Sequence, residues 1–207
     1  MIIKVCGLKY PDNIADLASV DVDMLGFIFY DKSPRYCKPE AHISSVKHKL
    51  RVGVFVNSSF DEITDIVSVC GLNAVQLHGE EAPDLCRKLA DRRLVVIKAL
   101  PASSANDLQK AEAYIGAVDY ILFDTPCEAF GGSGLSFDHS ILLSYASAIP
   151  FLLSGGLRPD SLEGIRAFMR IAPPTFAGID LNSGFEIEPG LKNIAALQRF
   201  VSILRNI

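Results

Sequence analysis

The sequence lacks tryptophan, long apolar runs and any block of basic residues. Its apolar stretches, such as residues 94–97, are far shorter than the ~20 residues that a membrane-spanning helix needs. With 20 Lys and Arg against 24 Asp and Glu, the formal net charge is -4, which provides no basic field for nucleic acid. We therefore expect neither a membrane nor a nucleic acid as partner.

Cysteine is scarce and unpaired in its spacing. Five residues make an odd count without a C-x-x-C pair, which argues against a disulfide framework and against a zinc site. They are Cys6, Cys37, Cys70, Cys86 and Cys127. The N-terminus has no charged segment followed by a long apolar one, so it is typical of a first strand and not of a signal peptide. We expect a cytoplasmic protein.

Eight short apolar runs rich in β-branched residues recur along the chain, 20 to 30 residues apart from start to start. They cover residues 2–6, 24–29, 51–56, 74–77, 94–100, 119–124, 149–154 and 176–180. Amphipathic segments with helix-start signals lie between them, as at Pro11, at Ser59 with Glu62, and at Pro159. The pattern predicts an α/β fold, a single (β/α)8 TIM barrel over residues 1–207. An open doubly wound sheet is the structural alternative, but it does not explain the eighth unit.

Polar and glycine residues collect where the predicted strands end, which is where this architecture builds its active sites. The candidates at or just beyond strand ends are Cys6, Arg35, His78, Asp124, Gly155, Gly156, Asp180, Ser183 and Gly184. The sequences Ser154-Gly155-Gly156 and Ser183-Gly184 follow strands seven and eight, where barrels often bind phosphate through backbone N–H groups. Each stretch alone is equally typical of a tight turn. Residues 131–134, Gly-Gly-Ser-Gly, are typical of a loop that covers a site.

The candidate side chains each allow two interpretations. Asp124 follows four apolar residues that disfavour its charged form, so it suits a general acid, or it caps the next loop. Cys6 is either an inert buried thiol or a base activated by nearby positive charge. Arg35 offers a planar fork for a carboxylate or is a solvated surface residue. His78 either bonds substrate or fixes a loop.

The ordered set of motifs closely resembles the phosphoribosylanthranilate isomerase family over the whole chain. The matching stretches include Lys4-Val5-Cys6-Gly7, Ser33-Pro34-Arg35, Val75-Gln76-Leu77-His78-Gly79, Phe123-Asp124, Ser154-Gly155-Gly156-Leu157 and the segment from Gly178 through Ser183-Gly184 to Glu186, Gly190 and Lys192. The glycine motifs occur in other phosphate-binding barrels. The combination of Cys-Gly, Ser-Pro-Arg and Gln-Leu-His-Gly is specific.

The resemblance implies an Amadori rearrangement of a phosphoribosylated anthranilate. It assigns Asp124 as the acid that protonates the ribose ring oxygen and Cys6 as the base that removes the C2 proton. It further implies that Arg35 holds the anthranilate carboxylate, that the backbone near Gly156, Ser183 and Gly184 holds the phosphate, and that neither cofactor nor metal takes part. A phosphorylated small molecule is then the partner, and we expect the chain to be a monomer.

Two alternatives stay open at the level of sequence. Another phosphosugar barrel, of the indole-glycerol-phosphate synthase or epimerase type, shares the fold. Such enzymes are expected to carry a Lys acid at a strand end or a metal-binding His and Asp set, and neither pattern is clear here. A barrel that only binds a phosphorylated ligand would keep the glycine loops but would not need Cys6 and Asp124.

Overall fold

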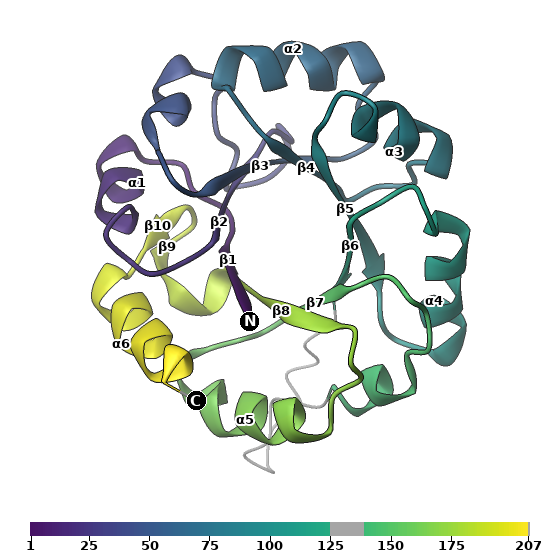
Figure 1. The fold of residues 1–207 in the computed structure, drawn as a ribbon. Coiled ribbons are helices and arrows are strands. Elements are labelled where there is room, and N and C mark those ends of the chain that lie inside the picture. Colours follow the sequence, from purple (N-terminus) through teal and green to yellow (C-terminus); the bar gives the residue numbers. More distant parts are fainter. Residues whose placement is uncertain (125–138, 207) are drawn as a thin grey trace.

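The computed structural model describes residues 1–124 and 139–206, and eight parallel strands in it close a barrel in the order of the chain. Figure 1 looks down the barrel, with the helices outside the ring of strands. The strands are β1 (Ile2–Val5), β2 (Met24–Ile28), β3 (Leu50–Phe55), β4 (Ala74–Leu77), β5 (Val95–Pro101), β6 (Tyr120–Asp124), β7 (Phe151–Ser154) and β8 (Phe176–Leu181). All eight predicted strands are confirmed, with bounds that differ by at most two residues, and the open sheet is excluded.

Alternating side chains divide the strands between two cores, as the period of two in a strand requires. Ile3 and Val5 point outward into the large core between the strands and helices. A smaller apolar layer fills the barrel itself, formed by Met24, Val52, Ala74, Ile97, Ala99, Leu122 and Leu152. Lys4, Gln76 and Asp180 are buried as well, although they are polar. The apolar layer does not extend through the whole barrel, and these polar groups lie in the part nearer the C-terminal ends of the strands.

The helices begin largely where the sequence signals place them. They are α1 (Pro11–Leu17), α2 (Phe60–Cys70), α3 (Pro83–Ala90), α4 (Ala105–Gln109), α5 (Leu162–Ile171) and α6 (Ile194–Arg205). The predicted capping box is confirmed at α2, because Ser59 accepts a hydrogen bond from the Glu62 backbone and the Glu62 side chain accepts one from the Ser59 backbone. Pro159 opens a 3₁₀ turn, η4 (Pro159–Ser161), and α5 follows it.

Two of the amphipathic connections form only short 3₁₀ turns in the described residues. These are η1 (Ala41–Ser45) after β2 and η3 (Ser140–Ser144) before β7. Another 3₁₀ turn, η2 (Lys110–Tyr114), extends α4. The connection after β2 contains Pro34 and Pro39, which lack a backbone donor and restrict the preceding residue, so a longer helix is disfavoured there.

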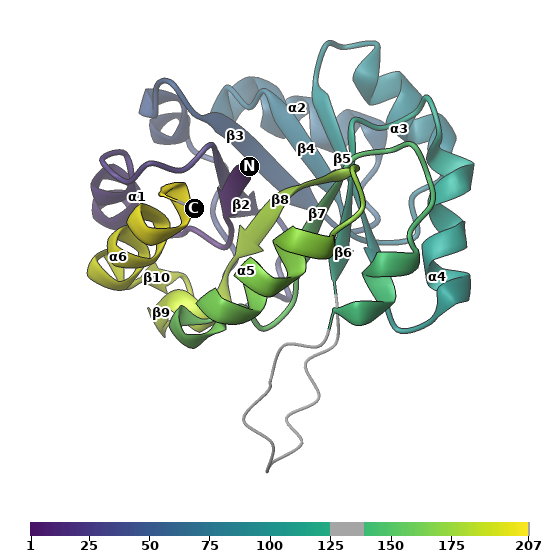
Figure 2. The same ribbon diagram turned by 60° about the horizontal axis from the view of Figure 1, so that its bottom comes forward.

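A small hairpin that the sequence did not predict follows β8. The chain passes through η5 (Ser183–Phe185) into the antiparallel pair β9 (Glu186–Glu188) and β10 (Leu191–Lys192) before α6 begins. In Figure 2 the strands run toward one end of the barrel, and β9 lies at that end. The hairpin therefore brings its side chains to the end where the candidate residues gather.

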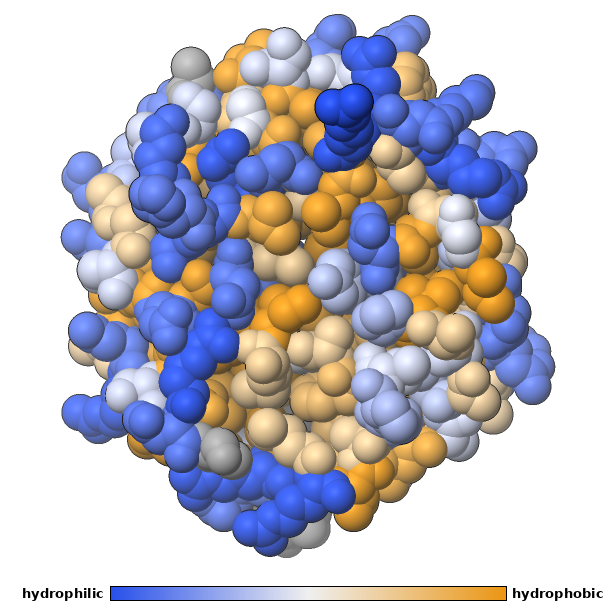
Figure 3. All heavy atoms as spheres, viewed as in Figure 1, coloured by the Kyte–Doolittle hydropathy of each residue, from blue (hydrophilic) through white to orange (hydrophobic). Residues whose placement is uncertain are grey.

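The opposite end, where the strands begin, is the face seen in Figure 3. Apolar residues cover much of its centre, and hydrophilic residues gather around its margin. Ile2, Leu50, Val95, Tyr120 and Ala177 pack there in partly buried positions against the interior layer. Within residues 1–124 and 139–206, no helix has the length and apolar character required to cross a membrane.

Candidate active site

A cavity of about 220 Å³ opens at the C-terminal ends of the strands. Its lining includes Cys6, Arg35, Gln76, His78, Asp124, Ser154, Gly155, Gly156, Asp180, Asn182 and Ser183. A second cavity of about 650 Å³ adjoins it and shares His78 and Asp124. The structure thus brings almost all predicted site residues to one cavity. Gly184 is not in the lining but directly follows Ser183.

Cys6 follows the last residue of β1, and its side chain is 3% exposed. Its backbone N–H donates to the carbonyl of Leu181 at 2.9 Å, which fixes it against β8. Lys4, on β1, precedes Cys6 by two residues. Its side chain lies in the barrel interior, where its Nζ is 3.0 Å from Asp180 Oδ1. Burial raises the pKa of the Cys6 thiol, and the charge of Lys4 acts in the opposite direction.

Asp124 ends β6 and lies at the edge of the cavity. Its Oδ2 is 3.6 Å from His78 Nε2, and His78 Nδ1 is 3.0 Å from Gln76 Nε2. The side chain of Asp124 is 48% exposed, so the expected apolar surroundings are wrong. The apolar residues of β6 are buried in the cores, while the end of the strand places the carboxyl at the solvent-facing rim. His78 is its nearest ionisable partner in the described part of the chain.

The two glycine stretches form a continuous rim of free backbone donors. Gly155 and Gly156 have φ values of 99° and 57°, as the tight-turn interpretation requires. No amide N–H of Gly155, Gly156, Ser183 or Gly184 donates to another residue within the described chain. A Cβ on Gly184 would overlap with the carbonyl oxygen of Leu157, so the two loops touch at this point. Unpaired N–H groups that converge from two loops suit an oxyanion such as phosphate.

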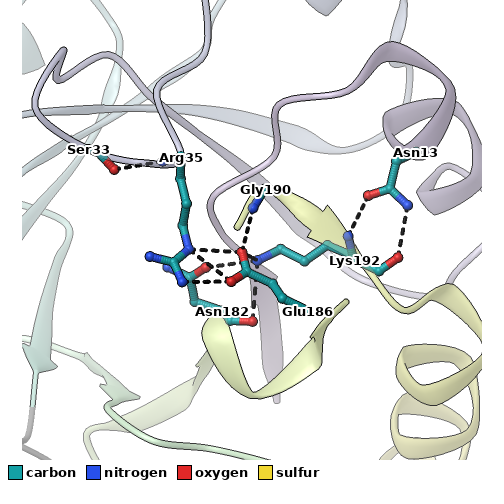
Figure 4. A network of polar contacts seen from close by, with 7 residues as sticks. All are labelled: Asn13, Ser33, Arg35, Asn182, Glu186, Gly190 and Lys192. Atoms are coloured by element: carbon teal, nitrogen blue, oxygen red, sulfur yellow. Dashed lines mark hydrogen bonds and ion pairs between the residues drawn. The ribbon is translucent and has the colours of Figure 1, made fainter. Parts of the chain in front are cut away.

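Arg35 reaches the cavity from the loop after β2, as Figure 4 shows. Its Nε lies 2.9 Å and 3.0 Å from the two carboxylate oxygens of Glu186, and its Nη2 lies 2.6 Å from Oε2. Lys192 Nζ lies 2.8 Å from Glu186 Oε1. The alternative of a solvated surface arginine is wrong, because the side chain is 22% exposed and paired.

Three charged residues of the site were not among the sequence candidates: Lys4, Glu186 and Lys192. A signal for Lys4 was present in the sequence, because it is a charged residue at an inward position of an apolar strand, two residues before Cys6. Glu186 and Lys192 belong to the unpredicted hairpin, so only their place in the family motifs pointed to them. Asp180 lines the cavity as predicted and in addition anchors Lys4. The expected covering loop, residues 131–134, lies outside the described residues.

Cofactor and metal binding were not expected. In the described ranges 1–124 and 139–206, no group of three His, Cys, Asp or Glu is arranged to hold a metal ion. The donors that remain are backbone N–H groups, the Arg35 guanidinium, a thiol and a carboxyl. This set can bind an oxyanion through the backbone N–H groups and a carboxylate through Arg35, and its thiol and carboxyl groups can transfer protons.

Fold and site together define a (β/α)8-barrel enzyme whose site combines an anion-binding rim with ionisable side chains. The family model for N-(5'-phosphoribosyl)anthranilate (PRA) isomerase matches residues 3–203. The chain belongs to this family.

Relatives in sequence and structure agree with the assignment. The N-(5'-phosphoribosyl)anthranilate isomerase of Parabacteroides distasonis is 48% identical over 206 residues, covering 97% of this chain and 92% of that protein. Monomers of a dimeric phosphoribosylanthranilate isomerase from Thermotoga maritima share 33% identity with a TM-score of 0.82, and both chains are covered completely. A phosphoribosylanthranilate isomerase in complex with reduced 1-(o-carboxyphenylamino)-1-deoxyribulose 5-phosphate has 34% identity and a TM-score of 0.82, with 100% of each chain covered.

The contact of Gly184 with Leu157 predicts a specific defect in phosphate binding. In Gly184→Ala the new Cβ must displace the Leu157 carbonyl, which misplaces the N–H donors of both loops. Loss of one charge-assisted hydrogen bond costs about 1.5–3 kcal/mol, so KM should rise about 10- to 100-fold while kcat changes less. Steady-state kinetics measure both constants. Gly116→Ala is the control for a strained glycine substitution outside the cavity, because its φ is 71° but a Cβ there meets nothing within 4 Å. An unchanged KM in Gly184→Ala would contradict the phosphate assignment.

Proposed function

We propose that this chain converts N-(5-phosphoribosyl)anthranilate into 1-(2-carboxyphenylamino)-1-deoxyribulose 5-phosphate, with Asp124 as general acid and Cys6 as general base. The overall reaction is the one that names the family, an aldose–ketose isomerisation of tryptophan biosynthesis. The observation that carries the residue roles is the shared cavity. Cys6, Asp124 and Arg35 line it together with Gly155, Gly156 and Ser183, which supports a common role for them in one reaction.

The first step opens the ribose ring. Asp124 donates a proton to the ring oxygen, the bond between C1 and that oxygen breaks, and the nitrogen lone pair forms the C1–N double bond of a protonated, positively charged imine. Its exposed position at the rim supports access to the ring oxygen of a bound sugar. His78, 3.6 Å away, is placed to orient the carboxyl group and to keep it directed into the cavity.

The second step forms the enolamine. Cys6 removes the proton from C2, the electron pair forms the double bond between C1 and C2, and the nitrogen becomes neutral. The enolamine then takes up a proton at C1 and releases the proton of its C2 hydroxyl group, which gives the ketone. A thiol that accepts a proton must first be a thiolate, and the buried Lys4 ammonium supports this charge at close range.

The two charged ends of the substrate are held by different groups of the cavity. The free N–H groups of Gly155, Gly156, Ser183 and Gly184 support phosphate binding, and Arg35 supports binding of the anthranilate carboxylate. Asp180, in the wall of the cavity, contributes through its ion pair with Lys4, which precedes Cys6 by two residues. Fixing both ends leaves the ribose between the acid and the base, which is the geometry that proton transfer needs.

The proposal includes one domain over residues 1–207 that acts as a monomer. The described cavity is complete within one chain, which supports it. The apolar centre of the face in Figure 3 and the dimeric Thermotoga relative favour the opposite outcome. Light scattering after gel filtration at micromolar concentration decides: we expect the mass of one chain, and twice that mass would contradict the proposal. The cytoplasmic location stays a prediction that cell fractionation tests.

The acid role predicts that Asp124→Asn folds and binds but turns over very slowly. The amide keeps the shape of the side chain and cannot deliver the proton, so kcat should fall about 10²- to 10⁴-fold. The substrate is generated in situ, and the change in anthranilate fluorescence gives the rate. Asp119→Asn is the matched control, because Asp119 precedes the same strand at its opposite end and accepts a hydrogen bond from Val96 there. A kcat within a few-fold of wild type in Asp124→Asn means that the acid lies elsewhere.

The base role predicts a similar loss in Cys6→Ala, about 10²- to 10⁴-fold in kcat, with nearly unchanged binding of the reduced product analogue. Cys6→Ser should be similarly slow, since a hydroxyl is a weaker base near neutrality. Substrate deuterated at C2 should show a primary isotope effect when proton abstraction limits the rate. Cys86→Ala, which also removes a fully buried thiol, is the control for packing. Near wild-type turnover in Cys6→Ala returns Cys6 to the inert cysteines.

A further inference from the structure

Within residues 1–124 and 139–206, one edge of the Arg35 guanidinium faces a protein acceptor. Glu186 occupies the edge formed by Nε and Nη2, with distances of 2.6 Å to 3.0 Å. Nη1 has no acceptor within the described part of the chain. The side chain of Glu186 is 6% exposed and that of Arg35 is 22% exposed, so the pair is sheltered, and Arg35 lines the cavity.

Glu186 is itself held by several donors, as Figure 4 shows. Its Oε1 accepts from the backbone N–H of Gly190 at 3.0 Å and from Lys192 Nζ at 2.8 Å. Lys192 Nζ donates further to Asn182, at 2.8 Å to Oδ1 and 3.3 Å to the carbonyl oxygen. The backbone of Lys192 is paired with the Asn13 amide on α1, at 2.8 Å and 2.9 Å. A chain of contacts therefore connects Arg35 to the helical layer.

The charges of Arg35, Glu186 and Lys192 do not cancel. A carboxylate bound to an arginine alone gives a neutral pair, which attracts a second carboxylate weakly. Here two basic side chains, Arg35 and Lys192, share one carboxylate, so the group carries one net positive charge when Lys192 is protonated. Burial lowers the pKa of Lys192, and the hydrogen bond and charge of Glu186 act in the opposite direction. Burial works to raise the pKa of Glu186, but the hydrogen bonds from Arg35 and Lys192 outweigh it and hold that pKa at about 2. Glu186 is thus charged at neutral pH, and Lys192, fully buried, cannot itself contact a substrate.

We propose that Glu186 and Lys192 are positioning residues for substrate specificity: Glu186 aims the free edge of Arg35 at the substrate carboxylate, and Lys192 restores the positive charge that Glu186 removes. The inference rests on the proposed role of Arg35. Rigid presentation of a planar fork reduces the entropy lost on binding and selects for a carboxylate at one position of the aromatic ring.

The test compares two analogues: the reduced 1-(o-carboxyphenylamino)-1-deoxyribulose 5-phosphate and the same compound without the ring carboxylate. Calorimetry gives the Kd of each for wild type, Glu186→Gln, Lys192→Met and Arg35→Ala. We expect Glu186→Gln and Lys192→Met to weaken the carboxylated analogue roughly tenfold through lost charge-assisted contacts. The analogue without the carboxylate should change less than about threefold, the usual spread of such contributions. Glu163→Gln on α5, which is not in the lining of the cavity and forms an exposed pair with Arg166, is the control for a charge change.

The sign of the effect decides between explanations. If Glu186 only neutralised Arg35, Glu186→Gln would leave more positive charge and tighten the carboxylated analogue, which overturns the proposal. Equal weakening of both analogues overturns it too, because that reports general damage. In the Arg35→Ala background, Glu186→Gln should add little. If Arg35→Ala itself loses no discrimination between the analogues, the role of Arg35 is wrong; if it does and Glu186→Gln does not, only the positioning role is wrong.

A measurement on the wild-type chain covers the case in which a variant does not fold. The Nε–H proton of Arg35, assigned by its loss in Arg35→Lys, should exchange slowly with solvent in the nuclear magnetic resonance spectrum, both without ligand and with the carboxylated analogue. Slow exchange in both states shows that Glu186 keeps its edge of the guanidinium. Fast exchange of the Nε–H proton in either state contradicts the proposal. Loss of its slow exchange when the analogue binds contradicts it as well.

Discussion

The pairing of the first strand with the last is the constraint on which the rest of the structure depends. β1 and β8 lie in register with Lys4 opposite Asp180, and the buried ion pair of 3.0 Å between them joins two residues 176 positions apart. Closure at this register places Cys6 beside the segment that begins at Asn182. Without it, the thiol, the second glycine loop and the hairpin with Glu186 would lie at opposite ends of an open sheet. The site is therefore a consequence of barrel closure.

Three buried lysines in the described chain each pair with a carboxylate: Lys4 with Asp180, Lys98 with Glu81 and Lys192 with Glu186. Such pairs contribute little net stability, because desolvation offsets the attraction, but one partner without the other is strongly destabilising. Their value here is geometric. The pair at β1 and β8 is consistent with a single register for closure, and the pair at the hairpin fixes the carboxylate that holds Arg35. Polar groups in this part of the barrel thus specify positions for the chemistry at the strand ends.

The sequence predicted what depends on local pattern and missed what depends on distant partners. Periodicity and spacing were enough for all eight strands, and the capping box at Ser59 follows from four residues. Motifs at strand ends also placed Cys6 and Asp124 correctly at one cavity. They did not show that Asp124 is half exposed, since exposure at a strand end is set by the surrounding loops. Nor did they show that Glu186 pairs with Arg35, 151 positions away, because no local rule specifies such a partner.

The proposed acid and the proposed base lie in unlike surroundings, and the difference suits the proposed tasks. Asp124 is at the rim, where water can return the proton that the proposed mechanism transfers to the ring oxygen. Cys6 is buried in the wall of the cavity, and this burial raises the pKa of its thiol. A thiolate there is scarce, but it binds a proton more strongly than an exposed thiolate, which favours abstraction from a weakly acidic carbon. Lys4 limits the scarcity without removing the basicity, because Asp180 compensates part of its charge. The basicity of the Cys6 thiolate therefore depends on the ion pair between Lys4 and Asp180, which also joins β1 to β8.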